Sequence, residues 1–351
     1  MPRVGLYDDP LFRKHDAGDG HHERPERLEA IRRGIWQAGL EPQLQILSPR
    51  PATSAELLRV HTAGHVALVA STEGRHYRFD PDTQAGPHSY PAALLAAGAV
   101  VDAVDRVLEG DLDRAFCAVR PPGHHALPDR AMGFCLFGNV AVAAAHALSR
   151  GLERVLIVDF DVHHGNGTQA MFYGEQRVLY VSSHAWPFYP GTGGIDEVGE
   201  GPGRGFTVNL PLPGGMGDPE YASVFRQIVE PVGRAFDPEL VLVSAGFDAH
   251  RGDPLAGMDL TAAGYADLMD VCVELAGGAG RGRVVVALEG GYGLPALSQS
   301  AAAVMRVLLG ERPPVLTPST SRPLEELLGG YRRALRPFWP ALGSTPAPLR
   351  G

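Results

Sequence analysis

Short apolar runs that end in polar residues recur along the chain. Val155–Phe160, Val178–Ser182, Leu240–Ser244 and Val284–Leu288 are almost continuously apolar, and Phe116–Val119 is a further candidate. Runs of this length and composition are typical of strands that are buried on both faces of a parallel sheet. The pattern therefore predicts a buried parallel sheet, with polar residues following the carboxyl ends of its strands.

Longer stretches with helical patterns separate these runs. They span Pro91–Leu108, Gly138–Arg150, Pro219–Ala235 and Thr261–Leu275. An alternation of strands and helices predicts an α/β fold, in which helices flank a central, mostly parallel sheet. In such a sheet, ligands bind at the carboxyl ends of the strands.

The chain has neither an internal repeat nor a long low-complexity linker, so we expect one domain over residues 1–310. Residues 311–351 are rich in Pro and Arg and contain a short helical pattern at Leu324–Leu335. We expect this segment to be an extension that packs on the core.

Composition narrows the class of protein. A net charge of -9 over 351 residues argues against a dedicated nucleic-acid binder, which needs a basic face. The longest apolar stretches are too short for a membrane span, and the first residues do not have the pattern of a signal peptide. Three scattered cysteines, Cys117, Cys135 and Cys272, favour a reducing cytosol over a disulfide framework. Lys14 is the only lysine, and Ala, Gly and Pro are abundant, which is typical of a GC-rich bacterial genome.

The segment from Asp159 to Gly167 follows the strongest predicted strand and is rich in acids and histidines. Strand alternation puts Asp159, Asp161 and His163 on one side and His164 on the other, where we favour a structural role. One carboxylate of this segment and His163 can bind a cation, and Asp248, just past another strand, can supply a second carboxylate. Such a set leaves room for water and substrate, as a catalytic zinc site requires, although Fe(II) or Mn(II) also suits it. Single acids in this position often cap helices, but the density of ligand side chains favours a metal site.

Two adjacent histidines, His124 and His125, follow a rigid Arg-Pro-Pro-Gly segment. Histidine is the natural proton shuttle near neutral pH, and each ring needs a carboxylate or an amide to set its tautomer. Asp159 and Asn166 are available for this purpose. Tyr292 follows a strand between glycines and can donate a hydrogen bond to a developing oxyanion, although alone it would be an ordinary turn tyrosine.

Together these motifs resemble the histone deacetylase superfamily, which has an arginase-like α/β fold. The resemblance is greatest to class II deacetylases and to bacterial acetoin-utilisation and acetylpolyamine amidohydrolase-like enzymes. It extends from about Tyr7 to about Leu309 and includes three further motifs, at His22–Leu28, Gly133–Cys135 and Pro190–Gly193.

The resemblance implies a catalytic role for five residues. His125 would be the principal general base and acid, and His124 its electrostatic partner. Asp159 would orient His124, and Asn166, the class II form at its position, would orient His125. Tyr292 would polarise the acyl carbonyl.

The resemblance also implies two bound cations. Zinc would be held by Asp161, His163 and Asp248. A structural potassium ion would lie near Asp159, Asp161, His163 and Ser182.

Four further residues would contact the substrate. Gly133, Phe134 and Tyr189 would belong to the wall of a narrow tunnel, and Tyr189 stands where the family commonly has phenylalanine. Leu255 occupies the position that is acidic in acetylpolyamine specialists, so an acyl-lysine substrate is favoured over an acetylpolyamine. Asp80 or Asp82 is a further candidate for the rim, while His21, His22 and His76 are expected to be ordinary surface residues.

The sequence therefore predicts a cytoplasmic, zinc-dependent amidohydrolase that removes acetyl or other acyl groups from amines. Its partner would be an acylated amine, with neither nucleic acid nor a membrane involved, and a homo-oligomer is left open. An arginase-type enzyme would need bridging carboxylates for a second Mn(II) ion, but Ala249 and His250 follow Asp248. A non-catalytic binder of acylated ligands would be expected to lose His125 or Tyr292, and both are present.

Overall fold

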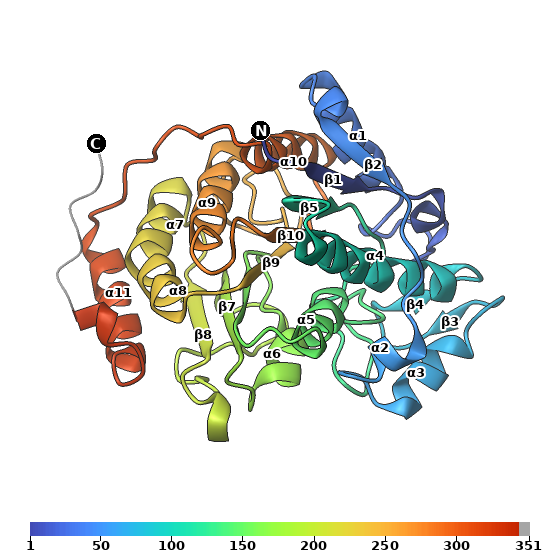
Figure 1. The fold of residues 1–351 in the computed structure, drawn as a ribbon, viewed down its shortest axis with the longest axis horizontal. Helices are drawn as coiled ribbons and strands as arrows, with labels where there is room; N and C mark the ends of the chain where they lie inside the picture. The colour runs from blue at the N-terminus through green and yellow to red at the C-terminus, as the bar shows by residue number, and fades with distance from the viewer. Residues whose placement is uncertain (344–351) are drawn as a thin grey trace.

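A parallel sheet of eight strands forms the centre of the fold in a computed structural model, which describes residues 1–343 (Figure 1). The strand order is β2-β1-β5-β10-β9-β6-β7-β8, and each pair of neighbours is parallel. The strands are β1 (Val4–Tyr7), β2 (Leu44–Leu47), β5 (Arg114–Cys117), β6 (Val155–Asp159), β7 (Val178–Ala185), β8 (Thr207–Leu212), β9 (Leu240–Ala245) and β10 (Val284–Leu288).

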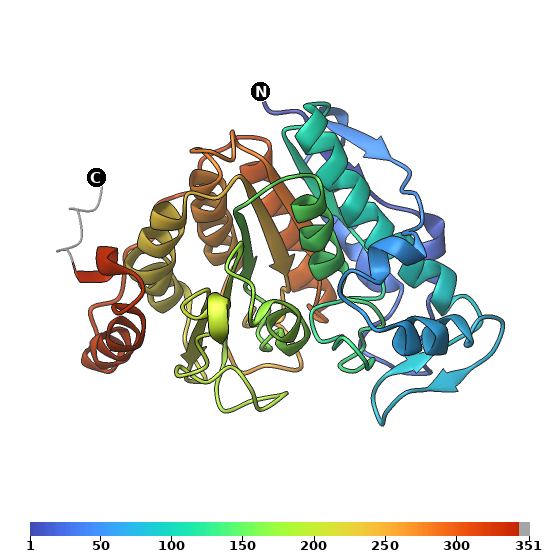
Figure 2. The same ribbon diagram turned by 60° about the horizontal axis from the view of Figure 1, so that its bottom comes forward.

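Helices cover both faces of this sheet (Figures 1 and 2). On one face α1 (Glu26–Gln37) and α9 (Ala262–Leu275) pack against α10 (Leu294–Leu308), and on the other α4 (Ser89–Glu109) packs against α5 (Asn139–Ser149). The other helices are α2 (Ser54–Leu57), α3 (Ala63–Ala70), α6 (Asn166–Phe172), α7 (Asp218–Val224), α8 (Glu230–Phe236) and α11 (Arg322–Leu335). The predicted α/β fold with a flanked parallel sheet is confirmed.

The predicted strands are present, but one of them is displaced. The run at Phe116–Val119 belongs to β5, which begins at Arg114 because Arg114 and Ala115 already pair with β1. It ends at Cys117 because the Val119 amide turns back to the Cys117 carbonyl at 2.9 Å. Of the eight strands in this sheet, the sequence pattern did not predict β1, β2 and β8.

The predicted helix at Pro219–Ala235 is interrupted. The structure has α7, a π-helical turn at Phe225–Val229 and then α8. Pro231, in the first turn of α8, has no amide hydrogen to donate to the preceding turn, which accounts for the widened turn before it.

The C-terminal extension lies beside the β8 edge of the sheet (Figure 1). The Tyr331 hydroxyl donates to the carbonyl of Pro211 in β8 at 2.6 Å, and the Trp339 indole donates to that of Gly205 at 2.8 Å. The domain boundary at residue 310 stays a prediction, and residues 344–351 of the extension lie outside the described residues. Within residues 1–343, none of the helices is long and apolar enough to cross a membrane.

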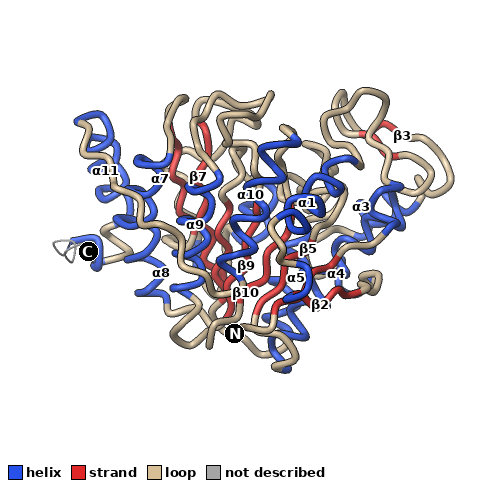
Figure 3. Tube along the Cα trace, turned by 90° about the horizontal axis from the view of Figure 1, so that it is seen from above, coloured by secondary structure: helices blue, strands red, loops and turns tan. Residues whose placement is uncertain are grey.

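Long loops gather at one end of the sheet (Figure 3). They follow the carboxyl ends of the strands, and the hairpin of β3 (Tyr77–Arg78) and β4 (Gln84–Ala85) lies at the same rim. Because the eight strands of the central sheet are all parallel, the polar residues that follow them meet at this end.

Candidate active site

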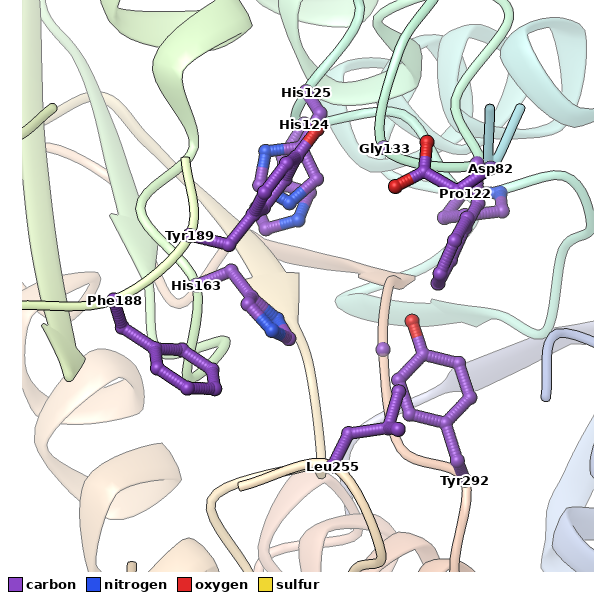
Figure 4. Close-up of a pocket in the computed structure, with 12 residues that line it drawn as sticks. Asp82, Pro122, His124, His125, Gly133, His163, Phe188, Tyr189, Leu255 and Tyr292 are labelled. Atoms are coloured by element: carbon purple, nitrogen blue, oxygen red, sulfur yellow. The ribbon is translucent and has the colours of Figure 1, made fainter. Parts of the chain in front are cut away.

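A cavity of about 260 Å³ opens at this rim (Figure 4). Its lining combines histidines with aromatic and apolar side chains, as is typical of small-molecule sites. The lining residues are Asp82, Pro122, His124, His125, Gly133, Phe134, His163, Phe188, Tyr189, Leu255, Gly290 and Tyr292.

Three ligand side chains form what we call the floor of the cavity: His163 lines it, and Asp161 and Asp248 contact the His163 ring from behind the lining. One atom from each of Asp161, His163 and Asp248 lies within 4.8 Å of the others. Both carboxylates are fully buried, and His163 Nδ1 is 3.1 Å from an oxygen of each. A single ring hydrogen cannot fully serve both carboxylates, and two buried acids need compensating charge. The donor set therefore suits a divalent cation.

Turns, rather than an extended strand, bring these ligands together. Strand β6 ends at Asp159, so the alternation expected as far as His163 does not apply beyond it. The Asp161 amide donates to Asp159 Oδ1 at 3.2 Å, and the His163 amide donates to Asp161 Oδ1 at 2.9 Å. Asp side chains commonly bend the chain in this way. As a result Asp161 and His163 face the ligand group, while Asp159 contacts His124.

The two adjacent histidines have different partners. His124 Nδ1 is 3.1 Å from Asp159 Oδ2, and His125 Nδ1 is 2.8 Å from Asn166 Oδ1. The ring centroids are 3.9 Å apart, and both side chains are buried. Because the Asn166 oxygen only accepts, it fixes the His125 hydrogen on Nδ1 and leaves Nε2 free to accept a proton.

Electrostatics also distinguish the two rings. Burial lowers the pKa of His124, but the charges of Asp161 and Asp159 outweigh it and raise that pKa to about 10. Burial lowers the pKa of His125, and the charges of His124 and His163 lower it further, well below its ordinary value. His125 is therefore the neutral member of the pair at pH 7 and the better general base.

Tyr292 directs its hydroxyl into the cavity from the side opposite His124 and His125 (Figure 4). The amides of Tyr292 and Gly293 both donate to Asp253 Oδ2, at 2.6 and 3.0 Å. The Gly290 amide donates to Asp161 Oδ2 at 2.8 Å, which ties this segment to the metal-ligand group. A side chain at Gly290 would collide with the Asp248 carboxylate, so the approach requires glycine.

The predicted tunnel residues all line the cavity. Tyr189 lies edge-on to His125, with ring centroids 5.2 Å apart. Gly133 has φ +55°, and a Cβ there would collide with the His125 ring. Phe134 also has positive φ, 68°, a conformation that side-chain residues rarely adopt and that is characteristic of functional sites. Leu255 contributes an apolar side chain to the mouth.

Some positions in or beside the cavity were not predicted from the sequence or were left open. Phe188 lines the cavity and stacks on His163 at 5.3 Å, and its place beside Tyr189 was the only available signal. Of the two rim acids, Asp82 lines the cavity, whereas Asp80 accepts backbone amides of its own turn. His21, expected at the surface, packs edge-on against Phe134 at 4.5 Å.

Two other predicted residues lie behind the cavity. His164 Nδ1 is 2.8 Å from the Thr192 hydroxyl, and its Nε2 is 2.9 Å from Gln169 Oε1. Ser182 pairs with Asp159 across β6 and β7, and its Oγ is 2.9 Å from His184 Nδ1. These contacts give His164 a structural environment and put Ser182 close to the turn at Asp159.

Comparison with known proteins agrees with this geometry. The histone deacetylase domain model matches residues 21–308. The chain is 46% identical to Histone deacetylase 15 of Arabidopsis thaliana, over 92% of this chain and 59% of that protein. It is 40% identical to a Probable deacetylase of Archaeoglobus fulgidus, over 82% and 81% respectively. The crystal structure of the HDA15 HD domain superposes with a TM-score of 0.92 and 42% identity, covering 97% of this chain and 96% of that one.

The fold and the site together define an α/β domain with a candidate metal centre at the carboxyl ends of its parallel strands. The chain belongs to the histone deacetylase family, and the predicted arginase/deacetylase-like fold is confirmed. It spans about half the length of several curated relatives, among them plant and yeast proteins.

Proposed function

We propose that this protein is a zinc-dependent deacetylase that removes acetyl or other acyl groups from acyl-lysine-type substrates. One observation carries the proposal: a three-ligand group, an oriented neutral histidine and a tyrosine hydroxyl converge on one cavity. The chain's membership of the histone deacetylase family supports the same reaction class.

Zinc is the proposed metal, and Asp161, His163 and Asp248 would hold it. Their two buried carboxylates and one imidazole match the donor types of catalytic zinc sites, although Fe(II) or Mn(II) would also bind them. When bound, zinc would polarise the acyl carbonyl and acidify a water molecule. Within residues 1–343 this is the one group of its kind, which disfavours an arginase-type site with two metals.

The remaining chemistry falls to the side chains around the cavity. His125 accepts the proton of the attacking water at Nε2, because its Nδ1 hydrogen is engaged by Asn166. Tyr292 donates a hydrogen bond to the carbonyl oxygen as negative charge develops there. Protonated His124, held by Asp159, stabilises negative charge nearby, and His125 or His124 returns a proton to the departing amine.

A structural potassium ion is a separate proposal. It would lie near Asp159, Asp161, His163 and Ser182. Asp159 and Ser182 are fully buried neighbours on adjacent strands, and oxygen-rich buried turns of this kind suit a large cation.

The cavity supports an acyl-lysine side chain as substrate. Phe134, Phe188 and Tyr189 provide apolar walls for a methylene chain, and Leu255 offers no charge to pair with the internal ammonium of an acetylpolyamine. The retention of His125 and Tyr292 disfavours a non-catalytic binder. A cytoplasmic location, a bacterial origin and a homo-oligomer stay predictions from the sequence.

The test is turnover by zinc-loaded protein of an acetyl-lysine peptide and, in parallel, of N-acetylated polyamines. We expect acetate release from the peptide. Release from polyamines alone would overturn the substrate class, and release from neither would overturn the deacetylase assignment.

A further inference from the structure

The proposed mechanism leaves unused a fully buried carboxylate, that of Glu23, which binds two arginines. Glu23 Oε1 accepts from Arg27 Nη1 at 3.1 Å and from Arg120 Nε, while Oε2 accepts from Arg120 Nη2 at 2.7 Å. His15 Nε2 lies 3.4 Å from the same carboxylate. The side chains of Glu23, Arg27 and Arg120 are fully buried, so each contact matters more than it would in water.

Each arginine belongs to a different part of the active site. Arg120 begins the loop that presents His124 and His125, and its Nη1 donates to the Phe12 carbonyl at 3.0 Å. Arg27 lies in α1, and its Nε donates to the Gly291 carbonyl at 2.7 Å, immediately before Tyr292. Its guanidinium carbon is 5.0 Å from the centre of the Tyr292 ring.

Glu289 closes these contacts into a ring. Its backbone carbonyl accepts from Arg27 Nη2. Its side-chain Oε2 accepts from the amides of Gly123 and His124, at 2.6 and 3.1 Å. The ring therefore runs from Glu23 through Arg27 and Glu289 to the histidine loop, and returns through Arg120.

We propose that Glu23 is a positioning residue that fixes the histidine loop and the Tyr292 segment relative to each other, so that His125 and Tyr292 address the same acyl carbonyl. The inference rests on the proposed deacetylase function. Replacing Glu23 by glutamine keeps the shape but leaves two buried guanidinium groups without their anion, and it turns an amide NH2 toward a donor. The ring then relaxes, and small displacements at a reacting centre are costly in rate.

The test compares Glu23→Gln with Glu26→Gln, the same change at an exposed position three residues later, where α1 begins. Both are assayed on acetyl-lysine and trifluoroacetyl-lysine peptides. The fluorine atoms make the carbonyl of the trifluoroacetyl group more electrophilic. Hydrolysis of the trifluoroacetyl peptide therefore depends less on the Tyr292 hydrogen bond than hydrolysis of the acetyl peptide does. Tyr292→Phe supplies the reference for that dependence.

For Glu23→Gln we expect kcat on the acetyl substrate to fall roughly 10- to 100-fold with KM within about 2-fold, since complete loss of an oxyanion donor costs about 10²- to 10³-fold. The loss on the trifluoroacetyl substrate should be several-fold smaller, as for Tyr292→Phe, and Glu26→Gln should match the wild type.

Equal losses on both substrates, or no loss, would overturn the positioning role, because a smaller folded fraction lowers both rates alike. If Glu23→Gln does not fold, Arg120→Lys replaces it in the test, because lysine keeps the positive charge but cannot make the bidentate contact with Glu23. The same comparison of the losses on the acetyl and trifluoroacetyl substrates then applies. If wild-type protein hydrolyses neither peptide, the proposed function is wrong and this inference falls with it. If the wild type hydrolyses the peptides but Glu23→Gln loses the same activity on both, only the positioning role of Glu23 is overturned, and the proposed function stands.

Discussion

The floor of the cavity and its mouth are built differently. At the floor, Asp161 and Asp248 are fully buried, and backbone amides from other segments bind them: Gly290 to Asp161 at 2.8 Å and Val162 to Asp248 at 2.9 Å. At the mouth, Phe188 and Tyr189 are 39% and 38% exposed and contact the site mainly through aromatic packing.

This contrast suggests a division of roles, in which the floor carries out the reaction and the mouth selects the substrate. Floor residues sit at strand ends and in cross-linked turns, so their positions are fixed before a substrate arrives, as preorganised catalysis requires. Mouth residues lie on loops, which tolerate variation more readily. Substitutions at the floor should therefore cost orders of magnitude in rate, and substitutions at the mouth should mainly change which substrate is preferred.

The largest effect is expected at the metal-ligand group. Asp248→Asn keeps the size of the side chain but removes one negative ligand, so we expect zinc to be lost and kcat/KM to fall by about 10³-fold or more. Metal analysis of the purified variant and an acetate-release assay measure the two effects. Asp259→Asn, an exposed aspartate paired with Arg251, is the matched control and should keep both properties. Full activity in Asp248→Asn would show that this ligand group is not catalytic.

The next largest effect is expected at Tyr292. Removing its hydroxyl in Tyr292→Phe should lower kcat by about 10²- to 10³-fold and change KM little, because the lost hydrogen bond strengthens mainly in the transition state. Steady-state kinetics with zinc content measured in parallel test this. Tyr173→Phe, outside the cavity, should leave kcat unchanged. A rise in KM alone would make Tyr292 a binding residue.

A pH-dependent effect on stability is expected at His61. His61 accepts a hydrogen bond from the Gly138 amide at 3.0 Å, and its Nδ1 is 3.1 Å from the Leu127 carbonyl, so it clamps the loop that carries Phe134. Burial, together with the charge of His65, lowers the pKa of His61 from 6.5 to about 4. The unfolded chain therefore takes up this proton between pH 6.5 and about 4 while the folded chain does not. The free energy of unfolding falls as pH falls through that window, by about 2–3 kcal/mol from this group.

Urea unfolding across that pH range tests the assignment. His61→Gln cannot titrate, so the stability difference between wild type and variant should shrink as pH falls. His76→Gln, the same change at a side chain that is 76% exposed, is the matched control. Parallel pH profiles for wild type and His61→Gln would show that His61 does not set the slope.

The smallest effect is expected at the mouth itself. Leu255→Glu introduces a negative charge for an internal ammonium group, so turnover of N-acetylated polyamines relative to an acetyl-lysine peptide should rise about 5-fold, as partly exposed ion pairs contribute up to about 1 kcal/mol. Leu255→Gln has a similar size without the charge and should leave the ratio unchanged. An equal rise in both variants would assign the effect to shape rather than charge.

Local motifs made the floor predictable from the sequence. Asp161, His163 and Asp248 each follow a buried strand, and parallel strands bring their carboxyl ends to one edge. The alternation argument failed beyond Asp159, because side-chain hydrogen bonds replace the strand there. The turns at Asp159 and Asp161 are not predictable from alternation, because their geometry depends on which backbone amides the two carboxylates bind.

Other features needed tertiary structure. Glu23 and Arg120 lie 97 positions apart, and neither motif shows that both are buried or paired. The edge strand β2 has only four residues, with Gln45 and Ile46 exposed, so it has no buried run for a pattern to detect. Phe188 has no motif of its own, and its contact with His163 follows from the path of the loop.

The central claim is that one zinc ion, held by the floor ligands, supports amide hydrolysis. The most direct measurement is acetate release from an acetyl-lysine peptide by metal-free protein titrated with zinc. Activity should be absent without zinc, rise with each addition and level off at about one equivalent per chain, as a single three-ligand site requires. Hydrolysis without added metal, or a plateau at two equivalents, would contradict this account.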